Sequence, residues 1–175
     1  MYKRQGLAFD SFGRLWIQTD GSYSNAGDFV NMGNNQMLAA DPGTKEIRRF
    51  LVGPSGCEIT GVTWTPDRKT MFINVQHPGE VSGHPRANNV WGHIVRWTEA
   101  SNDPTALTFN WDIFVLAGQP SITDARKPSA NITIDNLFNS PDGLAFDSFG
   151  RLWIQTDGSY SNAGDFVNML SLIHI

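Results

Sequence analysis

The residues best suited to chemistry in this sequence are metal-ligating side chains next to predicted β-strands. They are Glu58 in Gly-Cys-Glu, His77 and Glu80 in Gln-His-Pro-Gly-Glu, and Asp142 in Pro-Asp-Gly. Carboxylates are the ligands that hard metal cations prefer. A histidine three residues from a glutamate could also share a metal ion with it. These four residues are the candidate metal ligands of the chain.

Each candidate also has a plain structural interpretation. Asp142 can be a turn residue that accepts hydrogen bonds from backbone N–H groups before a glycine. Glu58 can be a solvated or hydrogen-bonded loop acid. A His–Glu pair such as His77 and Glu80 is a common loop feature. Residue type and spacing alone therefore leave both interpretations open at every position.

Motifs for nucleophilic or cofactor chemistry are missing from the sequence. It has no Ser-His-Asp order, P-loop, zinc-ligand spacing or dinucleotide fingerprint. For Cys57, the one cysteine, the sequence favours the role of a small buried residue over that of a thiolate ligand. Asp20 and Asp157, each in Thr-Asp-Gly, are more typical of turns that end strands. We therefore assign no catalytic and no cofactor-binding residue.

Short apolar stretches separated by glycine and proline predict the elements that carry these residues. Paired strands are expected at 7–9 and 15–19, 36–40 and 46–51, 60–64 and 70–75, and 93–97 and 110–116. The pattern glycine, aliphatic, small, aromatic begins two of these pairs, at Gly6 and at Gly61, and such repetition is typical of propeller blades. The sequence therefore predicts an all-β fold: an incomplete, unclosed β-propeller of about two to three four-stranded antiparallel blades.

One string of 27 residues, GLAFDSFGRLWIQTDGSYSNAGDFVNM, occurs twice without a change, at 6–32 and 143–169. Propeller blades that have diverged keep the residue pattern of the repeat but not the individual amino acids. Identity that extends into loop residues therefore indicates a recent duplication or a repeated overlap. One blade is expected at 6–53. Residues 59–76 supply two inner strands, against which 92–117 are expected to fold as two outer strands that belong to a different blade. Residues 143–157 begin a third blade.

Several segments together resemble the PhoX-type alkaline phosphatases. They are NNQMLAADP at 34–42, GCEITGV at 56–62, QHPGE at 76–80, GHIVRW at 92–97, WDIFVLAG at 111–118 and SPDGLAFD at 140–147. In that family the GHIVRW and WDIFVLAG elements precede SPDGLAFD, which precedes the GCEITG and QHPGE elements. We therefore expect a rotated piece of the C-terminal part of the family, joined near residues 80–85, with its overlap repeated at each end.

Both ends of the chain resemble translated sequencing adapters. They are Met-Tyr-Lys-Arg-Gln at 1–5 and Leu-Ser-Leu-Ile-His-Ile at 170–175. The expected organisation is a partial propeller over 6–169 between two adapter-like scars.

The resemblance implies a secreted or periplasmic parent protein that hydrolyses phosphate monoesters, with calcium and iron at one mouth of the propeller channel. The catalytic cysteine and arginine of the family, and most of its metal-binding acids, have no match in this sequence. We therefore expect the chain to bind no metal stably and to be inactive by itself. The alternatives are a fragment of a non-enzymatic binding propeller and a lactonase-like calcium propeller, the latter suggested by PDGLAFD followed by GRLW.

Composition limits the partners of the chain. It has 17 acidic and 13 basic residues, a net charge of −4, and no basic cluster of the kind that nucleic-acid binders carry. It contains no recognisable signal peptide and no apolar run of membrane-spanning length. The expected partners are a small phosphate ester in the parent protein and, through open blade edges, other copies of the chain.

Overall fold

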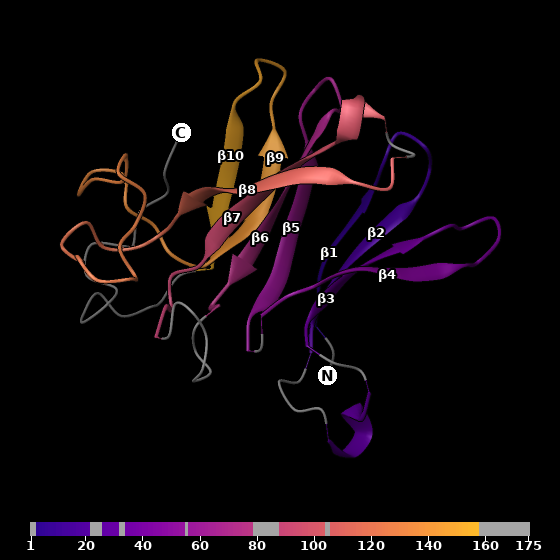
Figure 1. The fold of residues 1–175 in the computed structure, drawn as a ribbon, viewed down its shortest axis with the longest axis horizontal. Helices are drawn as coiled ribbons and strands as arrows, with labels where there is room; N and C mark the ends of the chain where they lie inside the picture. Colours follow the sequence, from indigo (N-terminus) through magenta and orange to yellow (C-terminus); the bar gives the residue numbers. More distant parts are fainter. Residues whose placement is uncertain are drawn as a thin grey trace.

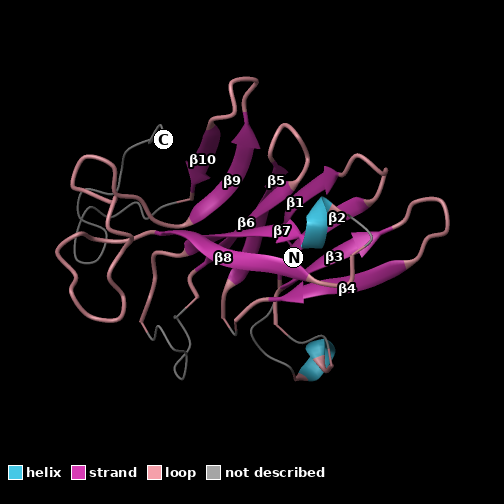
Figure 2. Cartoon of the chain, turned by 45° about the horizontal axis from the view of Figure 1, so that its top comes forward, coloured by secondary structure: helices cyan, strands magenta, loops and turns pink. Residues whose placement is uncertain are grey.

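The structure is a computed structural model that describes residues 3–21, 26–31, 34–54, 56–78, 88–103 and 106–157. The described residues form ten β-strands and two short 3₁₀ helices, without an α-helix (Figure 2). The strands are β1 (Lys3–Phe9), β2 (Leu15–Asp20), β3 (Gln36–Ala40), β4 (Ile47–Val52), β5 (Glu58–Trp64), β6 (Thr70–Gln76), β7 (His93–Glu99), β8 (Phe109–Leu116), β9 (Pro141–Phe146) and β10 (Leu152–Thr156). The 3₁₀ helices are Gly27–Phe29 and Ala100–Asn102. Within the described ranges, no helix is long and apolar enough to cross a membrane.

The strands form three antiparallel sheets, which we call the first blade (β1-β2-β3-β4), the second blade (β5-β6-β7-β8) and the third blade (β9-β10). Figure 1 shows the blades fanned side by side, with the second between the other two. Strand β5 packs against both β1 and β9, so the first strands of the three blades are neighbours. The predicted fold class is confirmed: the protein is all-β, and its blades form an incomplete propeller that does not close.

The strands lie close to where the sequence predicts them, with one clear difference. Strand β1 begins at Lys3 and not at Leu7, because Lys3 pairs with Asp20 and Arg4 with Thr19 in the ladder to β2. Strands β7 and β8 complete the second blade outside β6, so the two outer strands that the sequence assigned to a different blade form one sheet with β5 and β6.

The tight turns of the two identical hairpins have the same geometry. Asp10 accepts hydrogen bonds from the backbone N–H of Phe12 at 2.8 Å and from that of Arg14 at 3.0 Å. Its other carboxylate oxygen accepts from Arg14 Nε at 2.6 Å and from Trp16 Nε1 at 3.0 Å. Asp147 repeats the arrangement in the second copy, again with side-chain distances of 2.6 and 3.0 Å. Local sequence therefore fixes this turn in both places.

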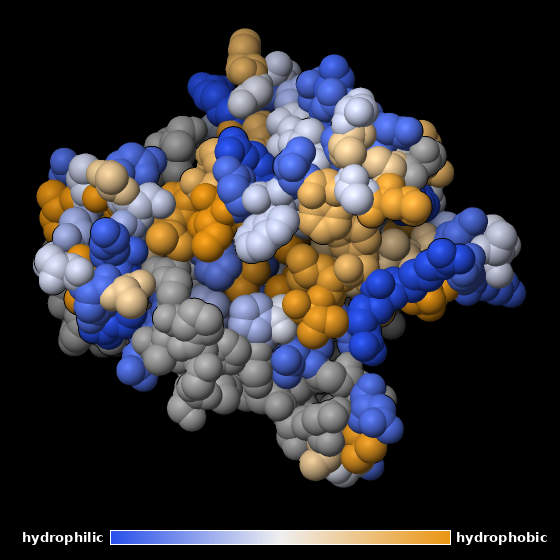
Figure 3. Space-filling view, in the orientation of Figure 1, coloured by the Kyte–Doolittle hydropathy of each residue, from blue (hydrophilic) through white to orange (hydrophobic). Residues whose placement is uncertain are grey.

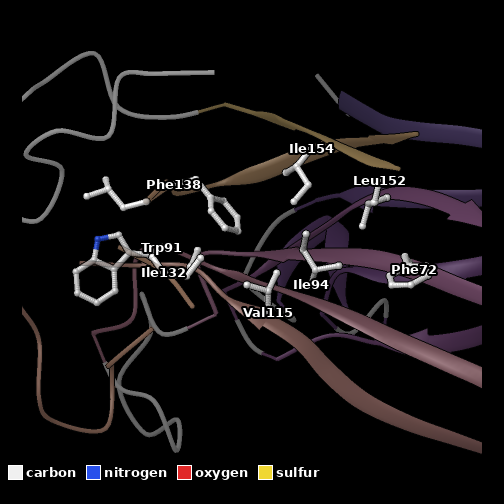
Figure 4. Close-up of a cluster of buried hydrophobic side chains, with 10 residues drawn as sticks. Phe72, Trp91, Ile94, Val115, Ile132, Phe138, Leu152 and Ile154 are labelled. Carbon is white, nitrogen blue, oxygen red and sulfur yellow. The ribbon is translucent and has the colours of Figure 1, made fainter. Parts of the chain in front are cut away.

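Two hydrophobic clusters hold the blades together, one on each face of the second blade. The cluster toward the first blade contains Trp16, Met37, Cys57, Ile59, Met71, Ile73, Val75, Val95 and Trp97. The cluster toward the third blade contains Phe72, Trp91, Ile94, Val115, Ala117, Ile132, Leu137, Phe138, Leu152 and Ile154 (Figure 4). Burial of this apolar surface is the main favourable contribution to the packing of blade on blade.

The two identical hairpins bury opposite faces. We call the side of the first hairpin with Leu7, Phe9, Leu15 and Ile17 its leucine face, and the side with Ala8, Trp16 and Gln18 its tryptophan face. The third blade has the same leucine face in Leu144, Phe146, Leu152 and Ile154, and the same tryptophan face in Ala145, Trp153 and Gln155. The first copy buries its tryptophan face, whereas the second buries its leucine face, because they lie on opposite sides of the second blade.

Apolar side chains also remain exposed on the outer strands. In the space-filling view they gather near the middle of the face shown, with hydrophilic residues around them (Figure 3). Exposed large apolar residues of β4 and β8 are Ile47, Phe50, Val52, Phe109, Trp111, Ile113 and Phe114. Such surface is normally covered in a complete propeller, where each blade packs between two others.

Candidate metal centre

The first strands of the blades approach one another most closely at glycines. Gly61 lies where the ladder between β5 and β6 is irregular, with a positive φ of 29°. A Cβ atom at this position would overlap the carbonyl oxygen of Asp142 in β9. Glycine therefore allows two backbones from adjacent blades to meet at the middle of β5.

The start of β9 is held by side chains of the second blade. Asn74 Nδ2 donates a hydrogen bond of 2.7 Å to the backbone oxygen of Asp142, and Thr60 Oγ1 donates one of 3.0 Å to that of Pro141. These bonds place the Asp142 side chain at the end of β5 where Glu58 begins that strand. Oδ1 of Asp142 is buried and has no hydrogen-bond partner in the described part of the chain. A buried carboxylate oxygen of this kind is available to a ligand.

Glu58 is the centre of the negative charge at this end of the blades. Burial raises the pKa of its carboxyl to about 7, and the charge of Asp20, a hydrogen bond with Asp20, and the charges of Asp142 and Asp157 add to the effect. A protonated Glu58 can donate a hydrogen bond to the carboxylate of Asp20, which is consistent with the raised pKa of Glu58. Burial, followed by the charge of Asp157, also raises the pKa of Asp142.

The four acids of this cluster come from all three blades: Asp20 ends β2, Glu58 begins β5, Asp142 lies near the start of β9, and Asp157 follows β10. We call them the acid cluster. Their mutual repulsion raises the free energy of the ionised state, and a bound cation would relieve it.

The structure describes only one of the other two residues predicted from sequence. His77 follows β6, and its Nδ1 lies 3.2 Å from the backbone oxygen of Val90. Glu80 lies outside the described residues. Cys57 is fully buried, as predicted, and burial raises the pKa of its thiol to about 12. Its thiol is therefore protonated near neutral pH, which suits a core residue and not a thiolate ligand.

Comparisons with known proteins assign the family. The sequence profile of the family "Alkaline phosphatase PhoX" matches residues 3–79 and 81–172. The chain belongs to the PhoX family of alkaline phosphatases. A solved structure of Pseudomonas fluorescens PhoX in complex with vanadate, a transition state analogue, is similar to it, with 26% sequence identity and a TM-score of 0.61. The similarity covers 93% of this chain and 40% of that one, so the chain spans about 40% of the length of that PhoX structure. No curated protein sequence matches the chain.

PhoX phosphatases depend on metal ions, and the chemistry of the acid cluster suits a hard cation. It offers four carboxylates, and one of them, Asp142, has a buried oxygen without a hydrogen-bond partner among the described residues. The arrangement of these side chains around a single point is incomplete. Among the residues that the structure describes, no three His, Cys, Asp or Glu side chains lie close enough to hold one ion. The acid cluster therefore supplies suitable donors for a PhoX metal site without forming a full coordination shell.

The sequence alone favoured Asp20 and Asp157 as turn residues, and the structure places both beside Glu58. A signal for their position was present in the strand pattern. In an antiparallel pair the last residue of the second strand lies beside the start of the first, so an acid that ends β2 or follows β10 lies at the same end as Glu58. The backbone N–H of Asp157 also donates a 2.9 Å hydrogen bond to the oxygen of Ser140, which extends the pairing of the third blade beyond β10.

Proposed function

We propose that the chain forms part of the metal-binding end of a PhoX-type phosphatase, a periplasmic or secreted enzyme that hydrolyses phosphate monoesters. The observation that carries the proposal is the acid cluster, in which burial, and then the charges of Asp20, Asp142 and Asp157, raise the pKa of Glu58 to about 7. Carboxylate oxygens in this number suit Ca²⁺, and iron completes the metal set that the family resemblance implies.

The residues of this chain would act by holding and orienting a cation. Glu58 and Asp142 are the principal donors, with Asp20 and Asp157 as neighbouring charges. Asn74 and Thr60 fix the backbone that carries Asp142, so its carboxylate is positioned before any ligand arrives. A bound cation supplies charge neutralisation for the phosphoryl oxygens of the substrate.

The chain by itself is proposed to be inactive and to hold Ca²⁺ weakly. The described residues do not include three ligands spaced around one point, and an incomplete ligand set cannot preorganise a phosphatase site. A dissociation constant on the order of 10⁻³ M would match exposed extracellular calcium modules. The family match favours the phosphatase over the lactonase-like calcium propeller.

The rotated organisation of the chain remains part of the proposal. The family profile matches in two segments that meet at residue 80, which supports a join in that region. The parent enzyme would then have the same acids in a closed ring of blades.

Calcium-dependent thermal unfolding tests the proposal. Above pH 7, where Glu58 is ionised, millimolar Ca²⁺ should raise the melting temperature of the wild type, and Glu58→Gln should abolish the rise. Glu46→Gln is the matched control, because Glu46 is an exposed residue before β4. A rise of equal size in the wild type and Glu58→Gln would overturn the assignment of the acid cluster. Hydrolysis of p-nitrophenyl phosphate by the purified chain would overturn the proposed inactivity.

A further inference from the structure

Each of the three blades has two different faces, and the faces of the second blade correspond to those of the first. In the second blade, Val62 pairs with Ile73 and Trp64 with Met71, as Leu7 pairs with Ile17 and Phe9 with Leu15 in the first blade. These four residues are therefore the equivalent of a leucine face. Thr63 pairs with Phe72, as Ala8 pairs with Trp16, so Phe72 lies on the equivalent of a tryptophan face.

Both interfaces inside the molecule join a tryptophan face to a leucine face. Trp16 of the first blade packs against Trp64 of the second, with ring centroids 6.2 Å apart, in the cluster that also holds Met71 and Ile73. Phe72 of the second blade packs against Phe146 of the third, with ring centroids 5.4 Å apart. Figure 4 shows Leu152 and Ile154 of the third blade directed toward the same cluster.

Among the described residues, this rule leaves one face of each kind without a neighbouring blade. Leu7 and Phe9 on the leucine face of the first blade are 52% and 60% exposed. On the tryptophan face of the third blade, Ala145 and Gln155 are exposed and Trp153 is half-buried. The uncovered leucine face has the same sequence as the one that packs on Phe72, and the uncovered tryptophan face the same as the one that packs on Trp64.

We propose that a second copy of the chain covers these faces, with the tryptophan face of the third blade of each copy on the leucine face of the first blade of the other. This contact joins a tryptophan face to a leucine face, as both interfaces within one copy do. It is head-to-tail, so it either closes a ring or propagates. Propellers close with about four to eight blades. Three blades are too few, whereas two copies supply six and three copies would supply nine. The assembly is therefore a closed dimer.

Mass measurement by light scattering with size-exclusion chromatography, in the presence of EDTA, tests the dimer independently of any metal site. The wild type should have twice the mass of one chain. Phe9→Asp places a charge on the exposed leucine face and should give a monomer with an unchanged circular dichroism spectrum. Leu107→Asp is the matched control, because Leu107 is fully exposed and lies outside both faces. It should remain a dimer.

A mixing experiment tests the head-to-tail arrangement. Ala145→Arg blocks the tryptophan face of the third blade, and Phe9→Asp blocks the leucine face of the first. Each variant alone should be a monomer, whereas their mixture should form heterodimers through the one intact pair of faces.

Four results would overturn the proposal: a monomeric wild type, an open polymer, equal dissociation of Phe9→Asp and Leu107→Asp, or an Ala145→Arg variant that still dimerises alone. The last result would indicate a contact between two leucine faces.

Discussion

The side-chain amide of Asn74 donates a 2.7 Å hydrogen bond to the backbone oxygen of Asp142, and so joins the second strand of one blade to the first strand of the next. Gln18 occupies the equivalent position in the first blade, beside the glycine of its hairpin, but neither atom of its buried amide has a partner among the described residues. Two equivalent amides therefore differ in what they contribute to the contact between blades.

Asn74→Leu should lower the stability of the chain by about 1–3 kcal/mol, because it leaves the oxygen of Asp142 buried without its donor. Gln18→Met, at the equivalent position, removes an amide that makes no bond and should be close to neutral. Urea unfolding of the two variants measures the difference. Equal losses of stability in the two variants would show that the hydrogen bond to Asp142 does not stabilise the chain.

Stability without calcium should fall as the pH rises from about 4.5 to about 7. The folded-state pKa of Glu58 lies above its ordinary value of 4.5, so the folded chain binds this proton more tightly than the unfolded chain. The stabilising contribution is fully present below the ordinary pKa and is lost as pH passes through about 7. Melting temperatures across this interval measure the effect. Glu58→Gln should flatten the curve, whereas Glu46→Gln should leave its slope in place.

Gly61→Ala should destabilise the chain by about 3 kcal/mol, because the new Cβ would overlap the oxygen of Asp142 and force the blades apart. Gly13→Ala is the control for backbone strain alone. Gly13 has a φ of 80° and no atom within 4 Å of a Cβ position, so its substitution should cost about 1 kcal/mol. Chemical denaturation separates the two, and a larger loss at Gly13 would contradict the close approach at Gly61.

Asp10→Ala should destabilise the chain more than Asp147→Ala, although the two residues make the same side-chain hydrogen bonds. The Asp10 side chain is 6% exposed and that of Asp147 is 21% exposed, so loss of Asp10 leaves its donors further from water. The expected loss at Asp10 is about 1–3 kcal/mol. Denaturant midpoints test the order, and the reverse order would show that the surroundings of the turn do not matter.

The sequence could predict the parts of the fold that depend on local pattern. Turns such as Asp10–Gly13 and the recurrence of the Gly6 pattern at Gly61 are visible as letters, and both are present in the structure. Which face of each copy of the repeated hairpin is buried could not be predicted in this way. Gln18 is buried, whereas Gln155, the same residue in the second copy, is exposed, because the neighbouring blade and not the local sequence decides which face is covered.

The candidate site was predictable only in part, for a similar reason. Glu58 and Asp142 stand beside strands in recognisable motifs, and the structure brings their charges together. Asp20 and Asp157 end strands in a motif that is common to turns, so their approach to Glu58 depends on how the blades pack. Residue type could not distinguish a carboxylate that caps a turn from one that also faces three others.

The repeated hairpin gives the folding chain two candidates for each place beside the second blade. Both copies carry the same apolar side chains, so an early collapse cannot distinguish them by contact energy. The connections can, once β1 to β4 have paired: residues 53–57 then join the first blade directly to β5, whereas residues 117–140 separate β8 from β9. A short connection closes at lower entropic cost than a long one. Chain connectivity, and not affinity, would then sort two indistinguishable hairpins, and lengthening residues 53–57 should make refolding partition between two routes.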